Sequence, residues 1–227
     1  MKMKTLAMLA GVGAPLIATA SAPAGFLGIT VVGKANEFGL IVCNVYANFD
    51  TPGDIFQAVA GTDAAPMLIQ VEGGGNFYNH AFGTDRAPGS ALIAAFPILA
   101  YDTFVTIGIK QTGVVDDALV ITPGFPVGIT GTSLSTNESG WAVTPIDPQG
   151  DPFNQNYVAG NGSILIGQFS TADGTGISGT MLVQYVPFGG DGQAVQSIVS
   201  FFHVPTPGAL ALLGTAGLIG ARRRRRS

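Results

Sequence analysis

Apolar and polar residues alternate with a period of two in several stretches of this chain. In the clearest stretch, residues 41–49, the residues expected on one face are Ile41, Cys43, Val45, Ala47 and Phe49. Asn44, Tyr46 and Asn48 alternate with them. Successive side chains of a β-strand point to opposite faces, so this pattern is typical of a strand with one face buried. The chain is therefore predicted to be built mainly from half-buried strands.

Further strand patterns follow one another along the chain, separated by turn sequences. Strands are predicted over 26–32, 55–60, 67–72, 101–110, 118–122, 164–169, 180–186 and 195–204, with one short helix over 90–96. Gly, Pro, Asp and Asn cluster between these segments, as in Thr51-Pro52-Gly53-Asp54, and such clusters form turns. Many short strands joined by turns predict an all-β domain, an antiparallel β-sandwich that is jelly-roll-like.

The composition supports strands over long helices. Charged residues make up 11% of the chain, against roughly 25% in an average soluble protein, and Gly is abundant at 33 residues. Exposed helix faces depend on Glu, Lys and Arg, which are scarce between the two ends of this chain. Its length suffices for one domain with a substantial core, which we place at residues 25–204.

Charge is distributed unevenly. All fourteen acidic residues lie between residues 25 and 204, together with only three basic ones, Lys34, Arg86 and Lys110, which gives this region a formal charge of −11. Nucleic-acid phosphates would be repelled, so nucleic acid is not expected as a partner. Cations or a hydrated polymer suit such a surface better.

The chain has a single cysteine, Cys43, so no intrachain disulfide can stabilise the domain. Cys43 lies on the predicted apolar face of the strand over 41–49. We therefore expect it to be a buried core residue.

The N-terminus has the three parts of a secretory signal peptide. Lys2 and Lys4 form a cationic start, residues 6–17 are mostly apolar, and Ala18-Thr19-Ala20 is a small-x-small exit. Residues 1–20 are therefore predicted to be a signal peptide read by signal peptidase, leaving a mature N-terminus at Ser21 or Gly25.

The C-terminus combines prolines, a short apolar segment and arginines. Pro205-Thr206-Pro207 precedes thirteen small or apolar residues, 209–221, and these precede Arg222, Arg223, Arg224, Arg225 and Arg226. Thirteen residues give about 20 Å of helix, short of the roughly 30 Å hydrocarbon core of a bilayer. The arginines are expected to stay on the cytoplasmic side. We predict a short transmembrane helix that holds the precursor transiently in the inner membrane.

This tail, residues 205–227, resembles a PEP-CTERM sorting signal. The resemblance is confined to about the last 24 residues, and Thr206 stands where the family has Glu. It implies recognition by an exosortase-type enzyme, cleavage near Pro205 to Pro207, and release or attachment at the cell surface.

Motifs for catalysis are weak. Residues 174–179 match G-x-G-x-x-G, but a strand rather than a helix is predicted to follow, so we interpret them as a hairpin connection. His80 and His203 are the only histidines, and no serine stands out as a nucleophile. Paired carboxylates of the glycosidase kind have no distinctive spacing. No enzyme activity and no obligatory cofactor are therefore expected.

Two binding sites are weakly indicated. Asp147 and Asp151 lie in a loop with further oxygen ligands that calcium could use, although turn chemistry explains them equally well. Trp141 and Tyr157 flank that loop and would stack on a sugar if exposed, or pack in the core if buried.

The expected function is that of an exported, non-enzymatic protein of the cell surface or extracellular matrix of a Gram-negative-type bacterium. A secreted carbohydrate-binding module, with an extracellular polysaccharide as partner, is the main alternative. A secreted hydrolase is a less favoured one.

Overall fold

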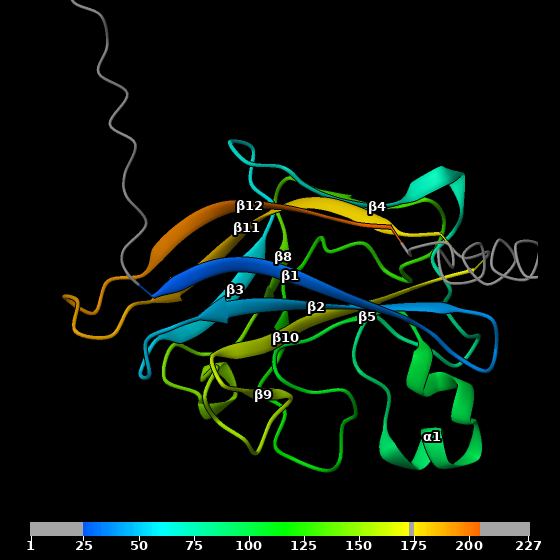
Figure 1. Ribbon diagram of the computed structural model, residues 1–227, viewed down its shortest axis with the longest axis horizontal. Helices are drawn as coiled ribbons and strands as arrows, with labels where there is room; N and C mark the ends of the chain where they lie inside the picture. Colours follow the sequence, from blue (N-terminus) through cyan, green and yellow to red (C-terminus); the bar gives the residue numbers. More distant parts are fainter. Residues whose placement is uncertain (1–24, 173–174, 205–227) are drawn as a thin grey trace, which may run out of the picture.

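The computed structural model describes residues 25–172 and 175–204, which form two antiparallel β-sheets packed face to face (Figure 1). The strands are β1 (Phe26–Ala35), β2 (Ile41–Phe49), β3 (Ile55–Ala60), β4 (Met67–Val71), β5 (Phe104–Val105), β6 (Val120–Ile121), β7 (Ser133–Thr136), β8 (Gly140–Ala142), β9 (Ala159–Gly160), β10 (Ser163–Thr171), β11 (Ile177–Val186) and β12 (Val195–His203). The helical segments are η1 (Glu72–Gly74), α1 (Ser90–Ala95), η2 (Pro97–Tyr101) and η3 (Pro148–Gly150). The all-β antiparallel sandwich predicted from the sequence is confirmed.

The first sheet, sheet A, has the strand order β1-β2-β10-β5, with β9 also paired to β10. β1 and β2 form a hairpin in which Lys34 lies opposite Val42. On its other side β2 pairs with β10, where Gln168 lies opposite Asn44. Directly opposite residues of an antiparallel pair project to the same face. Lys34, Val42, Asn44 and Gln168 thus share the outer face of sheet A.

The second sheet, sheet B, is built around β11. β12 pairs along one side of β11, while β3 and β4 pair with its two halves on the other side. β3 and β4 therefore occupy one strand position of the sheet, which is interrupted at residues 61–66. The next position is divided in the same way, because β8 pairs with β3 and β7 pairs with β4. At the interruption a Cβ on Gly61 would lie 2.1 Å from the Thr136 carbonyl oxygen, so only glycine fits there.

The core lies between the two sheets and matches the predicted alternation in the longer strands. Cys43, Val45 and Ala47 are fully buried, whereas Asn44 and Tyr46 between them are only partly buried. The inward faces of β4 and β11 contribute further core residues, namely Met67, Ile69, Val71, Met181, Val183 and Tyr185. The predicted burial of Cys43 is confirmed.

Three predicted features differ from the structure. The strand predicted over 101–110 is reduced to the two residues of β5, because Gly108 has a φ of 71° and the surrounding backbone is irregular. The connection before β11 is not a hairpin, because β10 belongs to sheet A and β11 to sheet B. The strand predicted over 118–122 is limited to β6.

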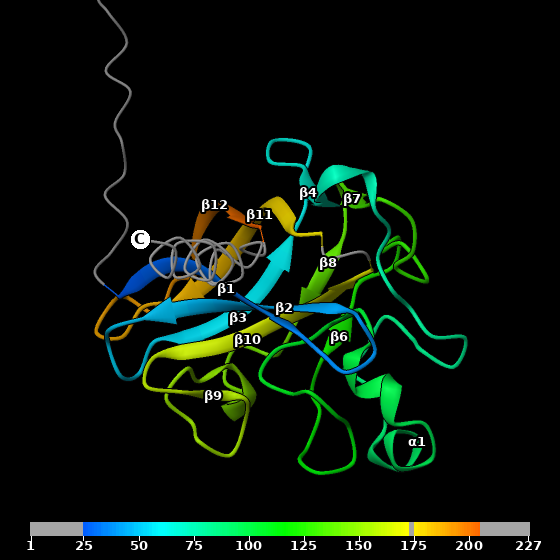
Figure 2. The same ribbon diagram turned by 45° about the vertical axis from the view of Figure 1, so that its right-hand side comes forward.

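The edge strands of the two sheets lie side by side. Figures 1 and 2 show β1 next to β12, and a Cβ on Gly33 of β1 would lie 2.0 Å from the His203 Nε2 of β12. This contact closes one side of the sandwich.

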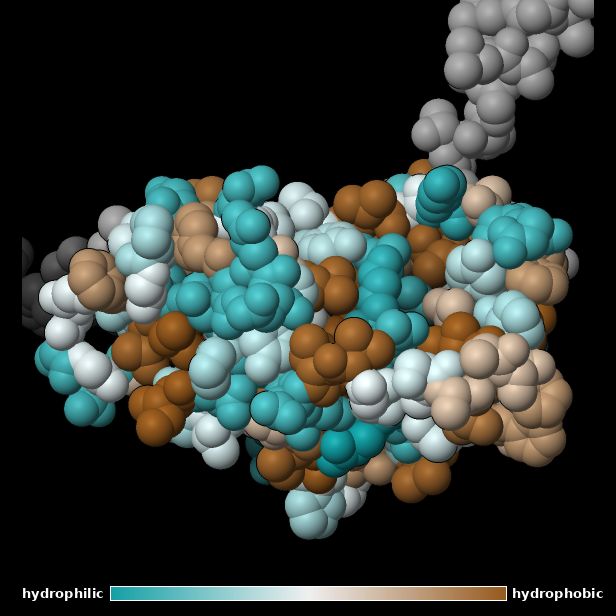
Figure 3. Space-filling view, turned by 90° about the horizontal axis from the view of Figure 1, so that it is seen from below, coloured by the Kyte–Doolittle hydropathy of each residue, from teal (hydrophilic) through white to brown (hydrophobic). Residues whose placement is uncertain are grey.

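α1 and η2 are inserted between β4 and β5 and lie at the end of the molecule where β1 turns into β2 (Figure 2). Figure 3 shows apolar residues gathered at the end that carries α1 and hydrophilic residues over the middle of the same face. Phe82, Leu92 and Phe96 of this segment are between 40% and 56% exposed. Within residues 25–172 and 175–204, no helix has both the length and the apolar character needed to span a bilayer.

Candidate functional site

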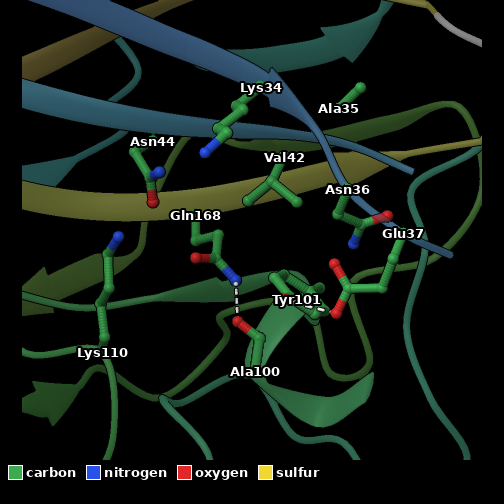
Figure 4. A pocket seen from close by; sticks show the side chains of 10 residues that line it. All are labelled: Lys34, Ala35, Asn36, Glu37, Val42, Asn44, Ala100, Tyr101, Lys110 and Gln168. Carbon is green, nitrogen blue, oxygen red and sulfur yellow. Dashed lines mark hydrogen bonds between the residues drawn. The ribbon is translucent and has the colours of Figure 1, made fainter. Parts of the chain in front are cut away.

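A pocket of about 340 Å³ lies on the outer face of sheet A (Figure 4). Its floor is formed by the outward residues Val42, Asn44 and Gln168 of β2 and β10. The remaining walls come from the end of β1, the β1–β2 turn, η2 and the loop after β5; they are Lys34, Ala35, Asn36, Glu37, Ala100, Tyr101 and Lys110. Six of the ten side chains that line it can form hydrogen bonds through amide, amine or carboxylate groups, and Tyr101 adds a hydroxyl.

Gln168 positions one wall of the pocket. Its Nε2 donates to the Ala100 carbonyl oxygen at 3.0 Å and to the Asp102 carbonyl oxygen at 2.8 Å. These bonds join η2 to the outer face of β10, and they account for a glutamine that is only 2% exposed on a face that would otherwise be open to solvent. The pocket exists because η2 covers one part of this face and leaves the neighbouring part uncovered.

Asn36 shapes the β1–β2 turn at the opposite wall. Its Oδ1 accepts hydrogen bonds from the Phe38 and Leu40 backbone N–H groups, each at 3.0 Å. Gly39, with a φ of 78°, allows the tight return to β2. The turn thereby places Glu37 against η2, where the Tyr101 hydroxyl donates to Glu37 Oε1 at 3.0 Å. This hydrogen bond raises the pKa of Tyr101.

The pocket has a cationic end. In Figure 4 the Lys34 and Lys110 side chains approach from opposite sides and their amines lie toward Asn44. Burial lowers the pKa of Lys110. The only ion pair in residues 25–172 and 175–204 joins Arg86 to Asp117 at 4.0 Å, so neither lysine has a carboxylate partner in this part of the chain.

The pocket also holds two amide atoms that lack hydrogen-bond partners. Asn36 Nδ2, a donor, and Asn44 Oδ1, an acceptor, are both buried without a partner in the described residues. Burying an amide group unpaired costs roughly 1–3 kcal/mol. Because both atoms are shielded from solvent, a ligand in the pocket could reach them only if the two side chains moved.

Sequence reasoning did not single out this pocket, because its residues come from five separate segments. One signal was available. Lys34 and Lys110 are two of only three basic residues between residues 25 and 204, and the fold brings both to one pocket.

The two aromatic residues predicted as ligand contacts have different environments. Trp141 is 1% exposed, and its Nε1 donates to the Thr106 and Ile166 carbonyl oxygens at 3.1 and 3.0 Å. It is a core residue with no face left for a sugar. Tyr157 is half-buried and borders a shallow groove of about 660 Å³ with Asp116, Asn154 and Asn156.

The two predicted calcium ligands serve as turn caps. Asp147 Oδ1 accepts from the Gln149 backbone N–H at 2.9 Å, and Asp151 Oδ1 accepts from the Phe153 backbone N–H at 2.8 Å. No group of three or more His, Cys, Asp or Glu side chains arranged to hold a metal ion occurs in the described part of the chain.

The remaining predicted site residues lie outside the described residues. They are Pro205, Thr206, Pro207 and the arginines 222–226, together with the signal peptide over 1–20. Comparison of the chain with protein-family models, with curated proteins and with solved structures finds no match.

Proposed function

We propose that this protein is an exported, non-enzymatic component of the bacterial cell surface or extracellular matrix. The observation that carries the proposal is the order of its segments. A cationic, apolar, Ala-x-Ala start precedes the β-sandwich, and a Pro-x-Pro box, a short apolar segment and five arginines follow it. Processing is by signal peptidase at one end and an exosortase-type enzyme at the other.

The domain is stabilised by packing rather than by a disulfide. Its core has no disulfide to form or lose, and its one thiol is fully buried. We propose a jelly-roll-like arrangement for the sandwich, supported by the repeated crossing of the chain between sheets, as from β2 to β3 and from β10 to β11.

A second candidate function, carbohydrate binding, is favoured by the pocket on the outer face of sheet A. Its lining offers amide, amine and carboxylate groups that sugar hydroxyls can pair with, since a hydroxyl both donates and accepts. Tyr101 is the one aromatic residue that lines the pocket, and the 47% exposed Phe38 packs against it at a ring separation of 5.7 Å. A glycosidase of the usual kind needs two carboxylates across the sugar, whereas Glu37 is the one carboxylate that lines this pocket. Binding is therefore preferred over hydrolysis.

Two sets of tail variants test the sorting proposal in the native host. Neutral residues in place of Arg222 to Arg226 should let uncleaved precursor escape to the medium, because the charge that holds the tail inside is lost. Pro205→Ala with Pro207→Ala should leave uncleaved precursor in the inner membrane, because the recognition box is lost and the anchor stays. If the proline variants are processed and distributed like the wild type, the tail is not a sorting signal.

A further inference from the structure

We infer that the pocket on the outer face of sheet A binds a carboxylated sugar, such as a uronic acid residue of a saccharide. The inference rests on the second proposed function, carbohydrate binding, and assigns to it a ligand class and a set of contact residues. The lysine amines would hold the carboxylate, and the amide, carboxylate and tyrosine groups would hold the sugar hydroxyls.

The distribution of basic residues favours an anionic group in the ligand. The region from 25 to 204 has a formal charge of −11, yet two of its three basic residues line one pocket of about 340 Å³. The third, Arg86, has a carboxylate partner in Asp117 at 4.0 Å, whereas the two pocket lysines have none in the described residues. Two unpaired amines aimed at the same space favour an anionic group between them.

The other polar side chains of the pocket favour hydroxyl groups in the ligand. Asn36 and Asn44 line the pocket, and Glu37 with Tyr101 lies at the end away from Lys110 in Figure 4. A simple anion such as phosphate would satisfy the lysines alone. A ligand with one carboxylate and several hydroxyls matches both ends.

The charge of the whole domain limits the ligand further. Because the Debye length is about 8 Å at physiological ionic strength, the pocket lysines act locally, while the acidic surface around them disfavours a densely charged chain. A saccharide in which carboxylated residues are terminal or sparse therefore fits better than a continuous polyanion. The pocket volume lies near the lower limit of roughly 300–1,000 Å³ for small-molecule sites, which suits a mono- or disaccharide.

The test measures binding of glucuronate, glucose and inorganic phosphate to the full chain by titration calorimetry. Glucuronate should bind more tightly than glucose by about tenfold, and added salt should weaken it. Lys34→Gln and Lys110→Gln should each weaken glucuronate binding by about tenfold while leaving the thermal midpoint unchanged. Arg86→Gln is the matched control, because it removes the third cation outside the pocket, and should leave binding unchanged.

Three results would overturn the inference. They also distinguish its failure from a failure of the carbohydrate-binding proposal. If glucose binds as tightly as glucuronate and the lysine variants behave like wild type, the pocket binds sugars without regard to charge and only the acidic ligand class is wrong. If phosphate binds as tightly as glucuronate, the lysines form an anion site without sugar recognition. If neither sugar binds, the inference and the carbohydrate-binding proposal fail together, while the sorting proposal is unaffected.

Discussion

Cys43 is the residue that reports most directly on strand register. It is fully buried on the inner face of β2, and burial raises the pKa of its thiol to about 12. Both the closed packing and the scarcity of thiolate oppose reaction with alkylating reagents. A maleimide should therefore leave Cys43 unlabelled in buffer at pH 8 and label it fully in denaturant. Rapid labelling in buffer would place Cys43 on the outer face, as a one-residue slip of β2 would do.

Asp102 is a buried carboxyl that should make stability depend on pH. Burial raises its pKa from the ordinary value of 3.8 to about 6, against the opposing effect of the hydrogen bond that its Oδ1 accepts from the His80 N–H at 2.7 Å. The folded state therefore binds the proton more tightly than the unfolded state does. Its stabilising contribution is complete below pH 3.8 and is lost as the pH rises through about 6.

The Asp102→Asn variant isolates this effect. Relative to the variant, the wild type should lose about 2 kcal/mol of unfolding free energy between pH 4 and pH 7, because only the wild type must ionise a buried group. Urea unfolding at several pH values measures the difference. The control, Glu138→Gln, removes an exposed carboxylate. The difference in unfolding free energy between this variant and the wild type should not change with pH. If the difference in unfolding free energy between Asp102→Asn and the wild type is also independent of pH, Asp102 is solvated in the folded protein.

At the scale of the elements, Trp141 of β8 joins the two sheets. It lies in sheet B, and its indole N–H reaches the Ile166 carbonyl oxygen of β10 in sheet A as well as that of Thr106. Trp141→Phe removes both hydrogen bonds and part of the contact with Phe125, whose ring is 5.7 Å away. We expect the unfolding free energy to fall by about 2–4 kcal/mol.

An apolar residue on the surface provides the control for Trp141. Ile146 is 91% exposed, and Ile146→Ala should change the unfolding free energy by less than about 0.5 kcal/mol. Denaturant unfolding measures both variants. A Trp141→Phe variant as stable as the wild type would show that the bridge between the sheets is not needed for stability.

The sequence predicted the long strands well and the short ones poorly, for a physical reason. β2 and β3 have the predicted bounds because one face is apolar and turn residues follow. The segment 101–110 has the same apolar spacing, yet its polar residues are buried too. Thr103 and Thr106 donate their hydroxyl hydrogens to the Ser170 and Ile109 carbonyl oxygens, at 3.3 and 2.8 Å. Side-chain hydrogen bonds of this kind cannot be recognised from the alternation of apolar and polar residues in the sequence.

Short strands and the pocket depend on distant partners. β7, with the sequence Ser-Leu-Ser-Thr, has a single apolar residue and forms because β4 pairs with it. Likewise, Lys34 and Lys110 are 76 positions apart and meet only because η2 and the loop after β5 lie against β1 and β2. The scarcity of basic residues was visible in the sequence, but their meeting was not.

At the scale of the whole molecule, the two ends and the domain differ in composition and charge. The domain carries an acidic surface, a closed side where β1 meets β12, and a cationic pocket on sheet A. The ends contain the apolar residues that would insert into a membrane and the basic residues that would orient them there. We propose that the ends deliver the domain to the cell surface and that the pocket acts once it is there.

We propose that both ends of the chain are removed during export. Intact-mass spectrometry of wild-type protein from the cell surface and from the medium of the native host tests it most directly. We expect the dominant species to begin at Ser21 or Gly25 and to lack Arg222 to Arg226. A dominant species that begins at Met1 or retains the five arginines would contradict it.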